Sequence, residues 1–305
     1  MAIEHTYKHF WEYKNLRVID CNQCGFKHLY PLPKEDELKK IYEEQFGEKV
    51  RKGFSERKKK DEEYWALAFE RRLYTYNQYL SSPQLRAPKI LDIGCGTGNL
   101  LNYFREKGWY IQGVEPSQNF AEELEYNKIP NIPRLFNEIT ISEWDDLGTF
   151  DVINMSMFLE HVLDPLSIIN TVASLLNPGG ILTIESPNDF NPLQMSIVET
   201  QDLPMWWITS LHINYFDFES LEALVKRAGL KPVTRNAQFP MEIFLHFGEQ
   251  YVGSSDVGRS VHLKRVAFEK NLHKSNQGRL LDELYKNIAK LGIGRTAIIH
   301  SKKVN

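Results

Sequence analysis

Short apolar runs alternate with amphipathic stretches through the middle of the chain, which predicts strands and helices in turn. Strands are predicted where β-branched and other apolar residues cluster, in KILDIG (89–94), YIQGVE (110–115), DVINMSM (151–157) and GILTIES (180–186). Helices are predicted to begin near Gly98, Ser117, Pro165 and Glu219, and further strands to cover 231–239 and 294–303. This alternation predicts an α/β fold.

The residues before this pattern divide into two parts. Residues 1–33 contain two short predicted strands around a C-x-x-C-G turn. Residues 34–85 are predicted to form a helical extension or lid, and the main domain to cover 86–305. In the extension, apolar residues recur at steps of three and four: Trp65, Phe69, Leu73, Tyr76 and Leu80. We expect this face to pack on the core. The alternative is that it forms a wall of the substrate cleft or a surface for a partner.

The last two predicted strands are separated by an unusually long connection. Residues 240–292 are helical in character and carry aromatic and basic side chains. A connection of this length inside a compact domain is usually functional, so we interpret it as a cap over the substrate.

Three glycines follow the first strand of the main domain, at Gly94, Gly96 and Gly98. A strand, a glycine turn and a helix start together place backbone N–H groups at the carboxyl edge of a parallel sheet. Asp92 disfavours a pyrophosphate there, but suits the amino group of a ligand. Glu115, after the second strand, is suited to accept both hydroxyls of a ribose. These features describe S-adenosylmethionine better than a nicotinamide dinucleotide.

With these motifs the chain resembles the class I S-adenosylmethionine-dependent methyltransferases. The resemblance covers D-x-G-x-G-x-G at 92–98, GVEPS with Glu115, FDVINMSMFLEHVLDP at 150–165 and LLNPGGILTIESPN at 175–188. It implies a Rossmann-like core, with a seven-stranded, mostly parallel sheet and helices on both faces. The N-terminal hairpin and helical extension, and the insertion between the last two strands, are then additions to this core.

The resemblance also implies a set of cofactor-binding residues. Asp92 and the glycine turn, which includes Cys95 as a small filling residue, are expected around the methionine moiety, and Glu115 on the ribose. Asn137 or Glu138 is expected at the adenine. Asn154 and Met155 are expected to line the pocket.

Two histidines are positioned to act as a general base if the methyl acceptor is a hydroxyl. His161 follows the fourth strand, in FLEHVLDP, and His212 lies after the fifth, in TSLHINYF. For each of the two histidines, the alternative is a structural role without part in catalysis. Methyl transfer itself mainly requires that the acceptor be held in line with the carbon–sulfur bond.

Further residues are candidates for substrate contact. Glu185 and Tyr215 are expected to orient the acceptor, and the aromatic stretch 205–216 to bind it or to pack in the core. Arg259 and His262, in the insertion, are expected to hold a phosphate of a nucleotide-linked sugar, although a surface helix face explains them equally well.

The pair Cys21 and Cys24 has the spacing of a zinc knuckle, which supplies two of four tetrahedral ligands. His5 and His9 would point the same way on a helix and complete the set, and His28 is close behind. Methyltransferases of the similar type carry a second C-x-x-C pair, which this chain lacks. The alternative is therefore a hairpin without metal.

Composition and charge narrow the function further. The chain has 305 residues, a net charge of −3 and three cysteines. The charge provides no general attraction to nucleic acid, and the odd cysteine count argues against a disulfide framework. We predict no membrane span and a cytoplasmic location.

The predicted function is transfer of a methyl group to a small-molecule acceptor, in particular a hydroxyl of a sugar or related metabolite. One alternative is an RNA methyltransferase, for which the basic run 49–60 would serve as a contact. The other is a non-catalytic S-adenosylmethionine-binding protein that recruits a partner through residues 1–85.

Overall fold

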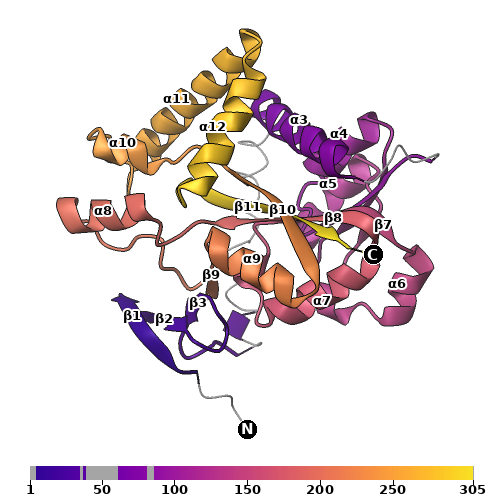
Figure 1. Cartoon of the computed structure of the whole chain (residues 1–305), viewed down its shortest axis with the longest axis horizontal. Coiled ribbons are helices and arrows are strands. Elements are labelled where there is room, and N and C mark those ends of the chain that lie inside the picture. The colour runs from indigo at the N-terminus through magenta and orange to yellow at the C-terminus, as the bar shows by residue number, and fades with distance from the viewer. Residues whose placement is uncertain (1–4, 35–36, 39–60, 81–85, 305) are drawn as a thin grey trace.

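A mixed sheet of seven strands forms the centre of the fold (Figure 1). The computed structural model describes residues 5–34, 37–38, 61–80 and 86–304. The sheet order is β10-β11-β8-β7-β4-β5-β6. Its strands are β4 (Lys89–Ile93), β5 (Tyr110–Val114), β6 (Asn131–Ile132), β7 (Phe150–Ser156), β8 (Leu176–Pro187), β10 (Leu230–Ala237) and β11 (Thr296–Lys303).

Neighbouring strands from β6 to β8 are parallel, and β11 is antiparallel to both β8 and β10. This topology confirms the predicted Rossmann-like fold with its mostly parallel sheet. The carboxyl ends of the parallel strands lie at one edge, where open α/β sheets bind their ligands.

Helices cover both faces of this sheet. They are α4 (Asn99–Glu106), α5 (Ala121–Tyr126), α6 (Ile141–Leu147), α7 (Pro165–Leu175) and α9 (Phe218–Arg227), with the short helices η1 (Gln118–Phe120), η2 (Phe136–Glu138) and η3 (Leu159–His161). Helix α8 (Pro192–Gln201) instead packs in a separate cluster with Val18 and Leu29. Side chains alternate along β7, so that Ile153 and Met155 face one hydrophobic cluster and Val152 faces the other. Helices α6, α7 and α9 pack in the first cluster, and α4 and α5 in the second.

A second, smaller sheet lies beside α9 (Figure 1). This N-terminal sheet consists of β1 (Tyr7–Tyr13), β2 (Leu16–Cys21), β3 (Lys27–Leu29) and β9 (Asn214–Tyr215), all antiparallel. The two strands predicted around the C-x-x-C-G turn are β2 and β3. The sequence did not reveal β9, which follows β8 in the main domain and pairs with β3 across most of the chain.

Three helices form a layer on the other side of the molecule, which we call the helical layer: α3 (Glu62–Tyr79), α11 (Ser255–Lys274) and α12 (Gly278–Lys290) (Figure 1). The latter two, with α10 (Glu242–His246), lie between β10 and β11, as predicted. The apolar face of α3 packs on the core through the fully buried Tyr76. The rest of the predicted helical extension, the basic run and most of the linker at 81–88 lie outside the described residues.

Buried ion pairs connect α3 to the other two helices of this layer. The Arg71 guanidinium lies 3.0 Å from a carboxylate oxygen of Glu269 in α11 and 3.9 Å from one of Asp282 in α12. Glu269 is fully buried. None of the helices described is both long and apolar enough to cross a lipid bilayer.

Candidate active site

The glycine turn between β4 and α4 has a backbone that requires glycine. Gly94, Gly96 and Gly98 have φ angles of 74°, 54° and 74°, a region that other residues rarely adopt. A Cβ atom on Gly98 would lie 2.9 Å from Ile129 Cγ1, and one on Gly94 would lie 3.2 Å from Phe158 Cδ2. The turn therefore packs closely against the segments that follow α5 and β7, whereas a Cβ on Gly96 would meet nothing within 4 Å.

Glu115 lies against this turn, at the end of β5. One carboxylate oxygen accepts a hydrogen bond from the Gly96 N–H at 3.0 Å, and the other accepts one from the Ser117 N–H at 2.9 Å. The structure thus brings together the turn and the acid that the sequence assigned to one ligand.

Asp92 and Asn154 are also brought together, because they pair across β4 and β7. The Asn154 side-chain amide donates to Asp92 Oδ1 at 2.6 Å. The Asn154 carbonyl oxygen accepts from Arg72 of α3, which also donates to Ser156 Oγ at 2.9 Å. Arg72 therefore places a positive charge at the carboxyl edge of the sheet, beside Asp92.

Arg72 was missed in the sequence, although a signal was available. It lies three residues after Phe69 and four before Tyr76, so it occupies the apolar face of its own helix. Part of this face lines a pocket between α3 and β10, with Trp65, Phe69 and Arg72 on its wall. Packing on the core is confirmed by Tyr76, and a wall of the substrate cleft stays a prediction.

Glu185 is engaged by the protein itself. Its carboxylate forms a buried ion pair with Arg72, and it accepts hydrogen bonds from Gln238 Nε2 at 2.6 Å and Thr296 Oγ1 at 2.9 Å. Burial alone would lower the pKa of Arg72, but the Glu185 charge raises it above its ordinary value. The structure therefore makes Glu185 the partner of Arg72 rather than a group that faces the acceptor.

Three other predicted cofactor residues have different positions. Met155 is fully buried in the core cluster on the face of β7 opposite to Asn154, so its side chain does not line the pocket. Cys95 is buried, and a Cβ on Gly113 would lie 2.7 Å from its sulfur, which agrees with a filling role. Asn137 is exposed in η2, after the edge strand β6.

The two predicted catalytic histidines lie side by side. The rings of His161 and His212 have centroids 5.4 Å apart in an edge-to-face arrangement. The Leu211 carbonyl accepts a hydrogen bond from His161 Nδ1 at 2.8 Å, which leaves Nε2 as the basic nitrogen of the neutral ring. His161 follows Phe158, the residue that packs on Gly94, by three positions. The histidine pair is thereby tied to the glycine turn.

Two buried carboxylates surround this pair. Asp189 Oδ2 lies 3.7 Å from His212 Nδ1, an ion-pair distance longer than a hydrogen bond. Glu160 accepts a hydrogen bond from Ser186 Oγ at 3.2 Å, and one of its oxygens lies 3.9 Å from His161 Nε2. The sequence motifs offered no signal for Asp189, because it lies in a loop after β8 with no distinctive spacing.

The environment separates the pKa values of these groups. Burial lowers the pKa of His161 to about 4 and raises the pKa of Glu160 to about 7. Burial also opposes the charge on His212, but Asp189 and Glu160 outweigh it and raise the pKa of His212 above its ordinary value. One neutral histidine and one readily protonated histidine therefore share a site.

Tyr215 holds the loop that carries His212. Its hydroxyl accepts from the Thr209 N–H and donates to the Thr209 carbonyl, both at 3.1 Å. Because these bonds occupy the hydroxyl, the structure gives Tyr215 a positioning role instead of the expected substrate contact. The aromatic stretch around it packs on the N-terminal sheet through Trp207 and Ile208.

Arg259 and His262 are likewise used within the protein. Both Arg259 Nη atoms bind the Asp61 carboxylate, at 2.8 and 3.0 Å, and His262 Nε2 lies 2.9 Å from it. Burial would raise the pKa of Asp61, but these two partners lower it. The expected phosphate contact is corrected accordingly, since these side chains join α11 to the start of α3.

The predicted metal ligands are only partly brought together. His5, Cys21 and Cys24 form a cluster, and His28 joins it, whereas His9 lies exposed in β1. The expectation that His5 and His9 share a helix face is wrong, because Tyr7–Tyr13 forms a strand.

Comparison with known proteins decides the family. Residues 59–235, more than half of the chain, match the family model described as a methyltransferase domain. The chain belongs to this family. The methyltransferase fold described above is that of the class I enzymes, whose cofactor is S-adenosylmethionine.

Curated relatives of this methyltransferase domain share one name. The ubiquinone biosynthesis O-methyltransferase of Vibrio parahaemolyticus is 34% identical over 95 residues, which cover 30% of this chain and 40% of the relative. The protein of that name from Bradyrhizobium is 29% identical over 126 residues, which cover 41% of this chain and 50% of the relative. The chain spans about half the length of the curated relatives it matches.

Two solved methyltransferase structures share the fold. Phosphoethanolamine N-methyltransferase 2 of Haemonchus contortus, in complex with S-adenosylmethionine, has a TM-score of 0.52 at 12% identity, covering 97% of this chain and 71% of its own. A methyltransferase in complex with the Trm112 methyltransferase activator of Haloferax volcanii has a TM-score of 0.52 at 13% identity. The match covers 85% of this chain and 97% of that methyltransferase. At these identities the likeness concerns the fold alone.

Proposed function

We propose that this chain transfers the methyl group of S-adenosylmethionine to a hydroxyl of a small molecule, with His212 as the general base. The observation that carries the proposal is the pairing of His212 with Asp189 beside His161, in a segment that packs on the glycine turn through Phe158. A base with a carboxylate behind it is the arrangement that removes a proton from a hydroxyl.

The residues at the carboxyl edge fit the cofactor. The N–H groups and the space of the glycine turn suit the methionine moiety, Asp92 suits its amino group, and Glu115 suits the ribose hydroxyls. Arg72, beside Asp92, is suited to the methionine carboxylate. When bound, the cofactor supplies a methyl group on a sulfonium with an excellent leaving group, so the protein has mainly to orient the acceptor.

The histidines have separate tasks in this proposal. His161 is neutral at physiological pH, and its Nε2 accepts a hydrogen bond that orients the acceptor hydroxyl. His212 takes the hydroxyl proton as the oxygen attacks the methyl carbon. The Asp189 carboxylate stabilises the imidazolium that forms, as its effect on the pKa of His212 indicates.

The chemistry of the acceptor follows from two sources. The curated relatives are named as O-methyltransferases of ubiquinone biosynthesis, which supports oxygen as the methylated atom. The finer proposal made from the sequence, a sugar hydroxyl, is retained as one of the acceptors to test. A nucleotide-linked sugar has less support, because the side chains expected to hold its phosphate, Arg259 and His262, form ion pairs with Asp61.

The first test is calorimetric titration of the full chain with S-adenosylmethionine and S-adenosylhomocysteine. We expect both to bind the wild type and neither to bind Asp92→Ala. Methyl transfer is then measured from labelled cofactor to phenols, sugars, small amines and RNA. We expect phenol or sugar hydroxyls to accept, and His212→Ala to lower kcat by about 10²–10⁴-fold while cofactor binding persists.

The matched control is His246→Ala, because His246 is exposed in α10, away from the histidine pair. Its activity is expected to equal that of the wild type. Folded wild type that binds no cofactor would refute the proposal. Binding without transfer to any acceptor would favour the non-catalytic alternative, and transfer to RNA alone would favour the RNA methyltransferase.

A further inference from the structure

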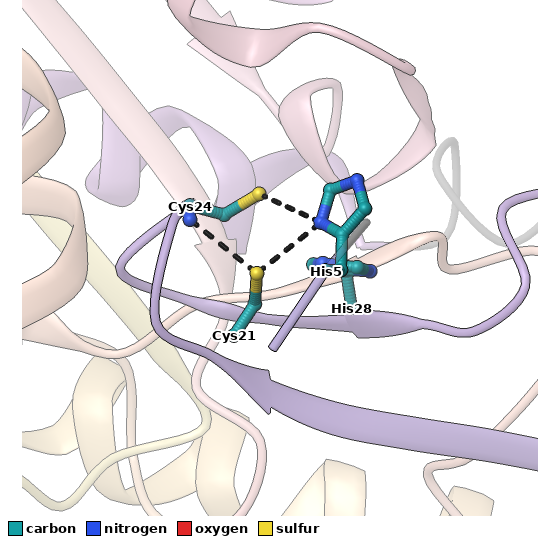
Figure 2. A group of neighbouring side chains, drawn as sticks. All are labelled: His5, Cys21, Cys24 and His28. Atoms are coloured by element: carbon teal, nitrogen blue, oxygen red, sulfur yellow. Dashed lines mark hydrogen bonds between the residues drawn. The ribbon is translucent and has the colours of Figure 1, made fainter. Parts of the chain in front are cut away.

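Four metal-ligating side chains meet at the C-x-x-C turn of the N-terminal sheet (Figure 2). His5 precedes β1, Cys21 ends β2, Cys24 lies in the turn and His28 lies in β3. One ligand atom from each residue lies within 4.8 Å of the other three. Neither cysteine forms a disulfide. Two thiols and two imidazoles thus face one point, although the four residues come from separate segments.

The distances within the cluster suit a tetrahedral metal ion. His5 Nδ1 lies 3.2 Å from Cys21 Sγ and 3.6 Å from Cys24 Sγ. Zinc bonds of about 2.0–2.3 Å at tetrahedral angles place neighbouring ligand atoms about 3.3–3.8 Å apart. Small shifts of side chains would therefore complete the coordination.

His28 provides an independent observation. The residue is only 1% exposed, and its Nδ1–H donates to the Leu29 carbonyl at 2.7 Å. This bond fixes the tautomer and leaves Nε2 with a lone pair. That nitrogen is buried and has no hydrogen-bond partner among the residues that the structure describes. A histidine that ligates a metal through one nitrogen typically donates the other N–H to a backbone carbonyl. A buried nitrogen with no partner otherwise costs stability.

We infer that His5, Cys21, Cys24 and His28 bind one Zn²⁺ ion. Four protein ligands close the coordination shell, so the site is structural rather than catalytic. His28 takes the place that the sequence had assigned to His9. The inference does not rest on methyl transfer, because none of these residues belongs to the proposed active site.

The site also has a connection to the histidine pair. β3 pairs with β9, and the Leu29 N–H donates to the Ile213 carbonyl at 2.8 Å. The Asn214 amide donates to the carbonyls of Leu159 and Val162, on either side of His161, at 2.9 and 2.7 Å. A metal that fixes β2 and β3 therefore holds the strand that follows His212.

The test begins with the metal content of the full chain, purified without a polyhistidine tag. We expect about one zinc per chain by mass spectrometry of the metal. His5→Ala and Cys24→Ser are expected to lower this content about tenfold or more. The matched control is His9→Ala, four residues from His5 and exposed, which is expected to keep the metal. His28→Ala is expected to lose the metal, and comparison with His9→Ala shows which of the two histidines is the fourth ligand.

A second measurement does not depend on how the variants fold. Wild type reconstituted with Co²⁺ is expected to show the strong visible bands of tetrahedral cobalt and a thiolate-to-cobalt band in the near ultraviolet. Absence of these bands after Co²⁺ is added to the metal-free wild type would overturn the inference, as would full zinc retention in Cys24→Ser. So would a Cys21–Cys24 disulfide in protein purified under reducing conditions. None of these results depends on the binding of S-adenosylmethionine.

Discussion

The N-terminal sheet and the helical layer are both additions to the central sheet, and they are attached to it in different ways. The N-terminal sheet is joined by backbone pairing between β3 and β9, and it buries a small cluster that includes Val18, Leu29 and Trp207. The helical layer is joined by an apolar helix face and by buried ion pairs around Arg71.

The difference reflects how much apolar surface each addition can bury. A two- or three-residue strand contributes little, and a small unit commonly relies on a metal or another crosslink. Helix α3 is long enough to reach the main core through Tyr76 and still carry charged contacts to α11. The comparison predicts that charge changes will damage the helical layer and that changes of ligands or backbone partners will damage the N-terminal sheet.

The largest effect is expected from Glu269→Gln in the helical layer. The change removes a buried carboxylate and leaves Arg71 with only the more distant Asp282. We expect the free energy of unfolding to fall by about 3–5 kcal/mol in urea denaturation. The control is Lys270→Ala on the same helix, whose partner Glu63 is exposed, with little expected change. Equal effects of the two variants would contradict the buried-pair interpretation.

The next effect concerns acid stability near the N-terminal sheet. The pKa of His161 is lowered from 6.5 to about 4 by burial, so below pH 6.5 the unfolded chain binds more protons at this site. Stability is therefore lost as the pH falls from 6.5 towards 4, by about 3 kcal/mol from this residue. We expect His161→Asn to flatten this part of the stability profile. An unchanged slope would show that the pKa of His161 is the same in the folded and unfolded protein.

A smaller loss is expected from Asn214→Ala, in β9. The variant removes the side-chain donor to the Leu159 and Val162 carbonyls, and Leu159 keeps the long 3.5 Å bond from the Val162 N–H. We expect this loss to cost about 2 kcal/mol. Because these carbonyls flank His161, methyl transfer is also expected to fall. Asn287→Ala is the control, since this exposed side chain bonds to the Glu283 carbonyl and to Lys290 on the surface of α12. If both variants retain wild-type stability, β9 does not anchor the histidine segment.

The smallest effect is a shift in the pH profile of kcat/KM in Asp189→Asn. The neutral amide no longer raises the pKa of His212, so the acidic limb of the profile is expected to move to lower pH. The measurement is initial rate against pH at low acceptor concentration. If the acidic limb of the kcat/KM profile does not move, a group other than His212 is responsible for it.

Much of the fold was predictable because the central strands and helices carry long periodic patterns. Strands β4, β7 and β8 are largely buried, β5 is buried at Gly113 and Val114, and α9 is amphipathic with Asp217 as its N-cap. By contrast, β6 and β9 are two residues long, and no period is visible in two residues. The pairing of β9 with β3 joins distant parts of the chain, which local patterns do not report.

The candidate site was predictable to the extent that its residues belong to motifs. The glycine turn, Glu115 and the two histidines were identified by their place after predicted strands, and the structure brings each group together. Met155 was assigned to the wrong face, although alternation along β7 with Asn154 already separated the two. Partners such as Arg72 and Asp189 come from elements without a motif, and only the tertiary fold brings them to the site.

The strand pairing between β3 and β9 also sets an order for synthesis. β1, β2 and β3 leave the ribosome well before β9, so their sheet is completed only after the central strands β4, β5, β7 and β8 have been made. Until then the outer edge of β3 has unpaired backbone groups, the kind of edge that pairs with other chains. An early-translated sheet thus waits for a strand made much later, and the nascent chain has to be protected for that interval.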